Sequence, residues 1–242
     1  MIDLIERRNV KSERSAAPIV IALDGTSASG KSTNAKLVAK ALDYVYVDTG
    51  AMYRTLAWYC LKKGVDPHDA KKVASLCRRW KTQLVCVNNH VRLLVDDYFP
   101  EREIRTSETS AAVSHVAAVP KVRDWMKKKQ RECIQFGNLV MEGRDIGTNV
   151  FPETDFKFYL DACINVRSSR RAAEGVTENL AARDQRDSQR AAAPLMIPLG
   201  ARIINNSEMT PEQSSALIIA EVKKRLKERE SRMLVAQHKP RW

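Results

Sequence analysis

The stretch Gly25-Thr-Ser-Ala-Ser-Gly30-Lys31-Ser32-Thr33 decides the fold of this 242-residue chain. It matches the pattern GxxxxGK[ST] and lies between a short apolar run, Ile19–Asp24, and a helical segment, Lys31–Leu42. Glycines let a backbone curve around phosphate groups, while successive N–H groups and a helix N-terminus supply positive dipoles. An ordinary Gly/Ser turn is the alternative, but strand, loop, Lys-Ser pair and helix are all in place. The stretch therefore predicts a phosphate-binding loop.

Two residues of this loop carry its chemistry. The lysine, Lys31, is expected to reach the β- and γ-phosphates of a nucleotide, and the Ser32 hydroxyl to hold Mg²⁺. A GTPase would also need an NKxD motif to read guanine, and a transport ATPase an LSGGQ-type signature. Neither motif occurs in the chain. The loop therefore indicates a small phosphotransferase or an ATPase of another kind.

The charge of the chain points to an anionic partner. Lys and Arg number 41 against 29 acids, which gives a net charge of +12. Such an excess suits nucleic acid, a membrane surface or phosphorylated small molecules. The basic segment Glu221–Trp242 resembles a solvated tail, whereas the arginines between positions 167 and 190 are grouped as in a binding site.

Other features exclude several classes of protein. No apolar run approaches the roughly 20 residues that a bilayer span needs. The N-terminus mixes acids and bases without an apolar block, so it does not predict a secretory signal. The five cysteines and four histidines are scattered without metal-ligand spacing. We therefore expect a cytoplasmic protein with reduced thiols, no membrane contact and no transition-metal site.

Short apolar runs alternate with helical segments, which is typical of a parallel sheet covered by helices. The strand candidates are Ile19–Asp24, Val45–Asp48, Leu139–Glu142, Phe156–Asp161 and Ile203–Asn205. The further helix candidates are Ala51–Lys63, Asp66–Trp80, Thr106–Val119, Lys121–Phe136 and a last helix from Pro211. Two runs, Gln83–Val87 and His90–Asp96, instead alternate apolar and polar residues across Asn88-Asn89, which predicts an antiparallel hairpin.

These patterns divide the chain into regions. We predict an α/β fold with a flexible arm at 1–17 and a parallel-sheet core formed by residues 18–64 and 137–235. Between the two core segments, residues 65–136 form an insertion that contains antiparallel strands and helices.

Two arginine-rich segments follow the last long strand candidate. The first holds Arg167, Arg170 and Arg171, and the second holds Arg183, Arg186, Asp187 and Arg190. The second set has the spacing i, i+3, i+4 and i+7, which puts all four side chains on one face of a helix. Two facing rows of guanidinium groups can clamp polyphosphates through bidentate contacts. A solvated charged helix is the alternative, and the phosphate-binding loop in the same chain favours the clamp.

Two more motifs follow strand candidates, where α/β sheets place their ligand contacts. In Glu142-Gly-Arg144-Asp145, the aspartate could hold Mg²⁺ or a substrate hydroxyl and the arginine a phosphate; a plain turn with a salt bridge is the alternative. The stretch from Asp48 to Arg54 presents a hydroxyl, an aromatic ring and an arginine. By itself it favours neither a site nor a structural role.

Taken together, these residues resemble the bacterial-type cytidylate kinase family from about Ile19 to Leu226. The resemblance rests on GTSASGKST, DTGAMYR, EIRT, AAVSHVAAVPKVR, EGRDIGT-x-VFP, RDQRDSQR followed by AAPL, and S-x-x-x-P-E-Q. It implies transfer of the γ-phosphate of ATP, with Mg²⁺, to CMP or dCMP. It also implies a three-layer nucleoside monophosphate kinase fold, in which 65–136 is the monophosphate-binding insertion and about 165–190 forms a lid. Only eleven residues separate Arg171 from Arg183, so this lid is short.

The resemblance also implies roles for individual residues. Those of the ATP-binding loop are Gly25, Thr26, Ser27, Ala28, Ser29, Gly30, Lys31, Ser32 and Thr33, with Ser32 as the metal ligand. Those expected to bind the acceptor nucleotide are Thr49, Tyr53, Arg54, Arg105, Ser114, Arg123, Asp145 and Asp187. Those expected to act in catalysis are Lys31, Arg144, Arg183 and Arg190.

The expected mechanism needs no protein base, because the acceptor is already an ionised phosphate. Two rival functions remain: another small-molecule kinase, acting on UMP or a sugar-like alcohol, and a basic RNA-associated protein that retains a phosphate-binding loop. No aromatic stacking pattern accompanies the basic tail, so we expect no nucleic-acid partner. We expect a monomer whose ligands are ATP and CMP or dCMP.

Overall fold

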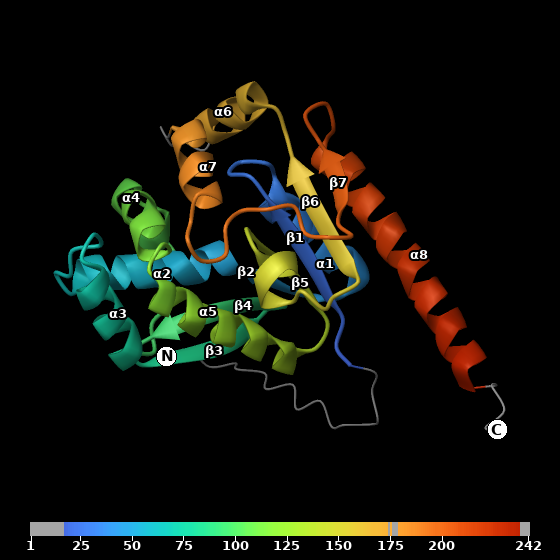
Figure 1. Ribbon diagram of the computed structural model, residues 1–242, viewed down its shortest axis with the longest axis horizontal. Helices are drawn as coiled ribbons and strands as arrows, with labels where there is room; N and C mark the ends of the chain where they lie inside the picture. The colour runs from blue at the N-terminus through green and yellow to red at the C-terminus, as the bar shows by residue number, and fades with distance from the viewer. Residues whose placement is uncertain (1–16, 174, 176–178, 238–242) are drawn as a thin grey trace.

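The computed structural model describes residues 17–173, 175 and 179–237. Its centre is a seven-stranded sheet in the order β3-β4-β2-β5-β1-β6-β7 (Figure 1). The strands are β1 Val20–Gly25, β2 Val45–Asp48, β3 Thr82–Val87, β4 His90–Val95, β5 Leu139–Gly143, β6 Phe156–Asp161 and β7 Arg202–Asn205. Every neighbouring pair is parallel except β3 and β4. The predicted α/β class with a mostly parallel sheet is confirmed.

Helices cover both faces of the sheet. The α-helices are α1 Lys31–Leu42, α2 Thr49–Lys62, α3 Ala70–Arg79, α4 Ser107–Val116, α5 Pro120–Glu132, α6 Ile164–Ala173, α7 Leu180–Ser188 and α8 Pro211–Gln237. Shorter turns are η1 Glu103–Arg105, η2 Cys133–Phe136 and the π-helical η3 Ile146–Val150. In the described part of the chain, no helix is both long and apolar enough to cross a membrane.

Alternation along the central strands builds two separate hydrophobic cores. In β1, Ile21 and Leu23 face the core shared with α1 and α8, whereas Val20 and Ala22 face the core shared with α2 and α5. Side chains of a strand point to opposite faces in turn, so a strand that is buried on both faces reads as a continuous apolar run. This is why the sequence predicted β1 as a buried parallel strand.

The hairpin β3–β4 extends the central sheet. Asn88 and Asn89 have φ of 52° and 57°, the left-handed conformation that suits a two-residue hairpin turn. The strand β4 also pairs in parallel with β2 through Tyr46 and His90. One continuous sheet therefore joins the predicted core to the predicted insertion, and the division into core, insertion and lid stays a prediction. The predicted arm lies almost wholly outside the described residues.

Side-chain caps explain where several helices begin. The carboxylate of Asp48 accepts from the Ala51 N–H at 2.8 Å, so α2 begins at Thr49 and not at Ala51. Asp69 caps α3 in the same way, which moves its start from the predicted Asp66 to Ala70. A side-chain oxygen at the N-cap satisfies an N–H that has no partner inside the helix.

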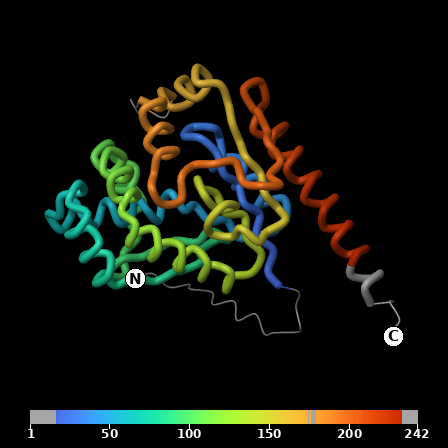
Figure 2. Tube along the Cα trace, viewed as in Figure 1, coloured from blue at the N-terminus to red at the C-terminus, as the bar shows by residue number. Residues whose placement is uncertain are grey.

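The segment that leaves β6 turns back over the phosphate-binding loop. Figure 2 shows α6 and α7, in yellow and orange, above the blue loop between β1 and α1. The helix α7 ends at Ser188, so Arg190 lies beyond it, and the prediction that one helix carries the whole second arginine set is wrong. The helix α8 runs as far as Gln237.

Candidate functional site

A cavity of about 950 Å³ opens at the carboxyl ends of β1, β2 and β5. Most predicted site residues line it: Ser27, Ala28, Gly30, Lys31, Ser32, Thr33, Thr49, Tyr53, Arg54, Arg105, Ser114, Arg123, Arg144, Asp145, Arg183, Asp187 and Arg190. Gly25, Thr26 and Ser29 lie behind this lining and shape the loop. Five segments that are far apart in the sequence therefore meet around one space.

Two glycines give the phosphate-binding loop its path. A Cβ on Gly25 would lie 2.0 Å from the carbonyl oxygen of Leu160 on β6, so only glycine fits between these strands. Gly30 has a φ of 85° and forms the N-cap of α1, which is a left-handed conformation that other residues rarely adopt. The loop can therefore leave β1 closely packed and enter α1 with its N–H groups directed toward the cavity.

The amine of Lys31 is buried within the loop. Its Nζ donates to the Thr26 carbonyl oxygen at 2.5 Å and to Ser29 Oγ at 3.4 Å. Burial lowers the pKa of Lys31 to about 7, and the nearby cations Arg144 and Arg183 lower it further, against the opposing charge of Glu142. The charged form of this amine is therefore unfavourable until an anion binds beside it.

Oxygen groups gather beside Ser32. The Tyr46 hydroxyl donates to Glu142 Oε1 at 2.6 Å, and Ser32 lies within hydrogen-bonding reach of both side chains. Burial raises the pKa of Glu142, as does the neighbouring Asp48, while Lys31 opposes the shift. A hydroxyl and a carboxylate at the mouth of a phosphate-binding loop are donors that Mg²⁺ prefers, so the residues fit this ion. Within the described segments, no cluster of three His, Cys, Asp or Glu side chains could hold a metal ion.

On the other side of the cavity, Arg123 and Asp145 form a buried ion pair. Arg123 Nη2 lies 2.7 Å from Asp145 Oδ2, and both side chains are less than a tenth exposed. The guanidinium also stacks over the ring of Tyr53, 5.5 Å from its centroid. Arg123 Nε has no hydrogen-bond partner within the described part of the chain. A buried donor without a partner costs free energy unless a ligand supplies the acceptor.

A second buried carboxylate organises two arginines. Asp187 accepts from Arg144 Nε at 3.0 Å and pairs with Arg190. Burial opposes ionisation of Asp187, but Arg144, Arg190 and Arg183 outweigh it and lower the pKa of its carboxyl group. Asp187 therefore holds the guanidinium groups of Arg144 and Arg190 in fixed orientations along the cavity wall.

Arg54 and Arg105 line another part of the cavity. Arg54 donates to Ser110 Oγ at 2.7 Å, and burial lowers the pKa of its guanidinium to about 10, with Arg183 and Arg105 adding to the shift. Arg105 Nη2 lies 3.1 Å from Asp48 Oδ2. Several cations so close together, with few carboxylates between them, favour a multiply charged anion.

A fully buried aspartate positions the Arg144-Asp145 turn. Asp24 accepts from the N–H groups of Ile146 and Gly147 at 2.8 and 2.7 Å, which ties η3 to the end of β1. Burial raises the pKa of Asp24 to about 7, although both N–H groups oppose the shift. The sequence marked Asp24 only as the end of a strand, because nothing local shows that a segment more than a hundred residues away will reach it.

The two arginine rows do not face the cavity as complete rows. Arg167 lies outside the lining and is buried against the loop, where Nη1 donates to the Ser27 carbonyl oxygen at 3.1 Å and pairs with Asp184. Arg186 is exposed and also lies outside the lining. The expectation that both rows clamp phosphates as units is therefore wrong, since α6 and α7 turn some of these side chains toward protein partners.

Sequence reasoning missed two residues that hold the phosphate-binding loop. Asp184 Oδ1 accepts from the Ser27 N–H at 3.1 Å. Asn206 donates to the Ser29 carbonyl oxygen at 2.8 Å and accepts from Arg170 Nη1 at 3.0 Å. Asn206 could have been found, because it directly follows a strand candidate at the ligand-binding edge of the sheet. Asp184 gave no such signal.

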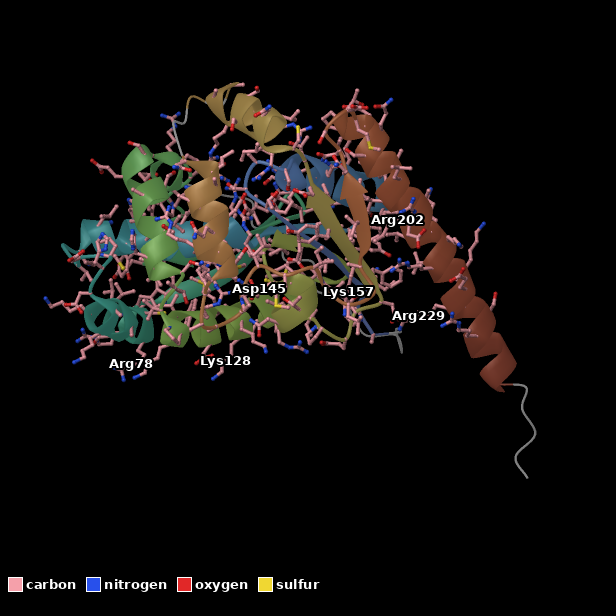
Figure 3. All side chains as sticks on the ribbon, turned by 45° about the horizontal axis from the view of Figure 1, so that its top comes forward. Arg78, Lys128, Asp145, Lys157, Arg202 and Arg229 are labelled. Atoms are coloured by element: carbon pink, nitrogen blue, oxygen red, sulfur yellow. The ribbon has the colours of Figure 1, made fainter. Side chains whose placement is uncertain are left out.

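Charge outside the cavity lies on the periphery. Figure 3 shows Asp145 below α7 in the interior, whereas Arg78 and Lys128 lie at the lower edge of the molecule and Arg229 lies on α8. Some of the positive charge therefore belongs to the surface, whereas Arg123, Arg144 and Arg190 of the site pair with buried carboxylates.

Comparison with known proteins agrees with this geometry. A family model described as cytidylate kinase matches residues 21–224. The chain is 38% identical over 219 residues to a cytidylate kinase of Limosilactobacillus reuteri (strain DSM 20016), covering 86% of this chain and 94% of that protein. It is 43% identical over 188 residues to one of Anoxybacillus flavithermus (strain DSM 21510 / WK1), covering 73% and 84%. It is 36% identical over 216 residues to one of Bacillus subtilis (strain 168), covering 85% and 96%.

Proposed function

The chain belongs to the cytidylate kinase family, and from this premise we propose how its residues bind the two nucleotides and transfer the phosphoryl group. The protein is a nucleoside monophosphate kinase that phosphorylates cytidylate in an ATP-dependent reaction. One observation carries the assignment of residues: a phosphate-binding loop and a group of arginines held by buried carboxylates line the same cavity.

The donor nucleotide binds at the loop from Gly25 to Thr33. The N–H groups at the start of α1 contact the phosphates, and Lys31 reaches the β- and γ-phosphates. The Ser32 hydroxyl would hold Mg²⁺, which would supply neutralisation of charge on the phosphates. Glu142 and Tyr46, which lie beside Ser32, complete an oxygen-rich surface at this position.

The acceptor nucleotide binds between α4, α5 and the turn after β5. Cytosine presents an amino donor beside ring and carbonyl acceptors, and Ser114, Arg123 and Asp145 offer matching acceptors and donors. The unpartnered Arg123 Nε supports a ligand contact at this point. The acceptor phosphate lies among Thr49, Tyr53, Arg54 and Arg105, and Asp187 lies near the sugar.

Transfer proceeds by positioning and charge neutralisation. The acceptor is already an ionised phosphate, so no side chain needs to remove a proton. Lys31, Arg144, Arg183 and Arg190 stabilise the charge that develops on the transferred group. Asp187 keeps Arg144 and Arg190 in place before substrate arrives, which reduces the reorganisation needed during the reaction. The helices α6 and α7 exclude water, the competing acceptor.

An acceptor panel tests the proposal. ADP formation is measured with ATP and, in turn, CMP, dCMP, UMP and AMP. We expect CMP and dCMP to be the preferred acceptors, and Arg123→Ala to lower kcat/KM for CMP by at least about tenfold, the usual loss for a charge-assisted contact. Equal rates with all four acceptors, or an unchanged Arg123→Ala variant, would contradict the assignment of Arg123 and Asp145 to the base.

A further inference from the structure

Arg186 is an arginine of the α7 segment that the mechanism above does not use. Its Nη1 donates to the hydroxyl of Ser114 on α4 at 3.4 Å, and its Nε turns back to the Ala182 carbonyl oxygen at 3.3 Å. The helices α4 and α7 contact each other at this place, and Figure 1 shows them side by side. Arg186 thus joins the lid to the helix that carries a residue assigned to the base.

The position of Arg186 on α7 follows from helix geometry. Successive residues are turned by about 100°, so Arg183 and Asp187 point in nearly the same direction, into the cavity. Asp184 then lies about 80° to one side of that direction and Arg186 about 80° to the other. Asp184 bonds to the N–H of Ser27 on the phosphate-binding loop, and Arg186 to Ser114. The helix α7 therefore spans the cavity and is fastened at the donor side and at the acceptor side.

The contact with Arg186 also defines the role of the Ser114 hydroxyl. A guanidinium can only donate, so it occupies a lone pair of Ser114 Oγ and leaves the O–H free to donate elsewhere. In the structure Ser114 donates to the Ala111 carbonyl oxygen at 3.4 Å. That bond is long, and an acceptor atom of a bound base can take its place. Arg186 thereby favours the donor role that Ser114 needs toward cytosine.

Two imidazoles lie next to this junction. The ring of His115, which follows Ser114 on α4, is 3.9 Å from the ring of His68, centroid to centroid. Burial lowers the pKa of His115, as do the charges of His68 and Arg186, and Asp66 opposes them. The Asp66 carboxylate also accepts from the backbone N–H of His68 at 2.9 Å. Protonation of His115 would place new positive charge beside Arg186, where the carboxylate of Asp66 offsets only part of it.

We propose that Arg186 is a positioning residue: it docks α7 on Ser114, so that Arg183 and Asp187 are held over a bound acceptor, and protonation of His115 weakens this docking in acid. This inference rests on the acceptor-site assignments proposed above. It predicts an effect on the acceptor and not on ATP, since the donor side of α7 is fastened separately through Asp184 and Ser27.

Steady-state kinetics near neutral pH test the docking. Arg186→Ala should lower kcat/KM for CMP by about fivefold, a loss in the range of one exposed charge-assisted hydrogen bond, with KM for ATP unchanged. Arg186→Lys should recover part of the loss, because lysine keeps a donor. The matched control is Arg78→Ala, an exposed arginine on α3 far from the cavity, which should behave as wild type.

The Ser114→Ala background separates docking from other effects. If Arg186 acts through Ser114, adding Arg186→Ala to the Ser114→Ala variant causes little further loss of kcat/KM for CMP. A fivefold loss of kcat/KM that persists in this background would overturn the proposal, as would a change in KM for ATP as large as the change for CMP. Wild type without activity on CMP would instead refute the proposed function. Wild type that is active, with Arg186→Ala unchanged, would refute only the docking role.

The pH dependence is read as a ratio, which cancels the titration of CMP itself. We compare kcat/KM of wild type with that of the His115→Gln variant at about pH 8 and about pH 5, well above and well below the usual imidazole pKa, because burial lowers the pKa of His115. The ratio should fall about threefold in acid, equivalent to a modest charge repulsion. In the Arg186→Ala background it should stay constant. A constant ratio in the wild-type background would overturn the acid effect.

Discussion

The titration of Lys31 predicts that ATP binding takes up a proton. Lys31 is 5% exposed, and burial lowers the pKa of its amine to about 7, with Arg144 and Arg183 adding to the effect. Phosphates of a bound nucleotide favour the ammonium form. Above pH 7 the empty enzyme therefore holds mostly the neutral amine, which must gain a proton when ATP binds.

The size of the pH effect on ATP binding follows from the difference between the pH of the solution and the pKa of Lys31. At about pH 8, one unit above the pKa, the Lys31 amine is neutral in roughly nine-tenths of the empty enzyme, and charging it costs about 1 kcal/mol. ATP should therefore bind about tenfold more weakly at pH 8 than at pH 6, where the amine is already charged. Proton uptake should be about 0.9 per ATP at pH 8 and about 0.1 at pH 6.

Titration calorimetry measures both quantities. Binding of Mg²⁺-ATP is followed at each pH in two buffers with different ionisation enthalpies, and the difference in heat gives the protons taken up. Lys31→Met removes the titrating group and should bind weakly with no pH dependence of this kind, which also corrects for the titration of ATP. Lys40→Met, an exposed lysine on the same helix, should match wild type. Uptake at pH 8 equal to that of Lys31→Met would refute the reasoning.

Four further predictions concern the arginines, the loop and the last helix. Arg183→Lys and Arg190→Lys should each lower kcat/KM for CMP at least about tenfold, because lysine keeps the charge but loses the planar fork; unchanged kinetics would contradict their role. Asp187→Ala leaves two partly buried guanidinium groups unpaired and should lower the free energy of unfolding by about 3 kcal/mol, measured by urea denaturation. Gly25→Ala should abolish folding, seen as loss of soluble protein, since its Cβ would lie 2.0 Å from a carbonyl oxygen. Truncation after Lys227 should leave turnover of CMP within about twofold, because the described side chains that follow are exposed or half-buried; failure to fold would show that they pack.

Local patterns in the sequence were enough to predict the elements that form the site. The loop from Gly25 to Thr33 needs glycines, a lysine and hydroxyls at fixed spacing, so it can be recognised from the local sequence without knowledge of any distant contact. The run Ile19–Asp24 predicted a strand buried on both faces, and Asn88-Asn89 predicted a hairpin because two left-handed residues suit that turn. These features depend on a few neighbouring residues only.

The tertiary structure decided what each charged side chain contacts. Sequence reasoning treated Arg167 and Arg170 alike, yet one is buried against Ser27 and the other lines the cavity beside Asn206. The direction of a side chain depends on the residue's angle around its helix and on the segment against which the helix packs. The spacing of arginines in the sequence defines only the angle. The end of α7 at Ser188 changed even that angle for Arg190.

The residues that the sequence could not reveal all act across long distances in the chain. Asp24 holds the turn at Ile146, and Asp184 caps a loop residue 157 positions away. A carboxylate of this kind has no local signature, because its partners are backbone N–H groups, which every segment offers. The sequence by itself determined the phosphate-binding loop, the strands and the family's motifs. Only folding decided which carboxylates would hold the loop, α7 and the arginines, since those contacts exist only after the sheet has brought distant strand ends together.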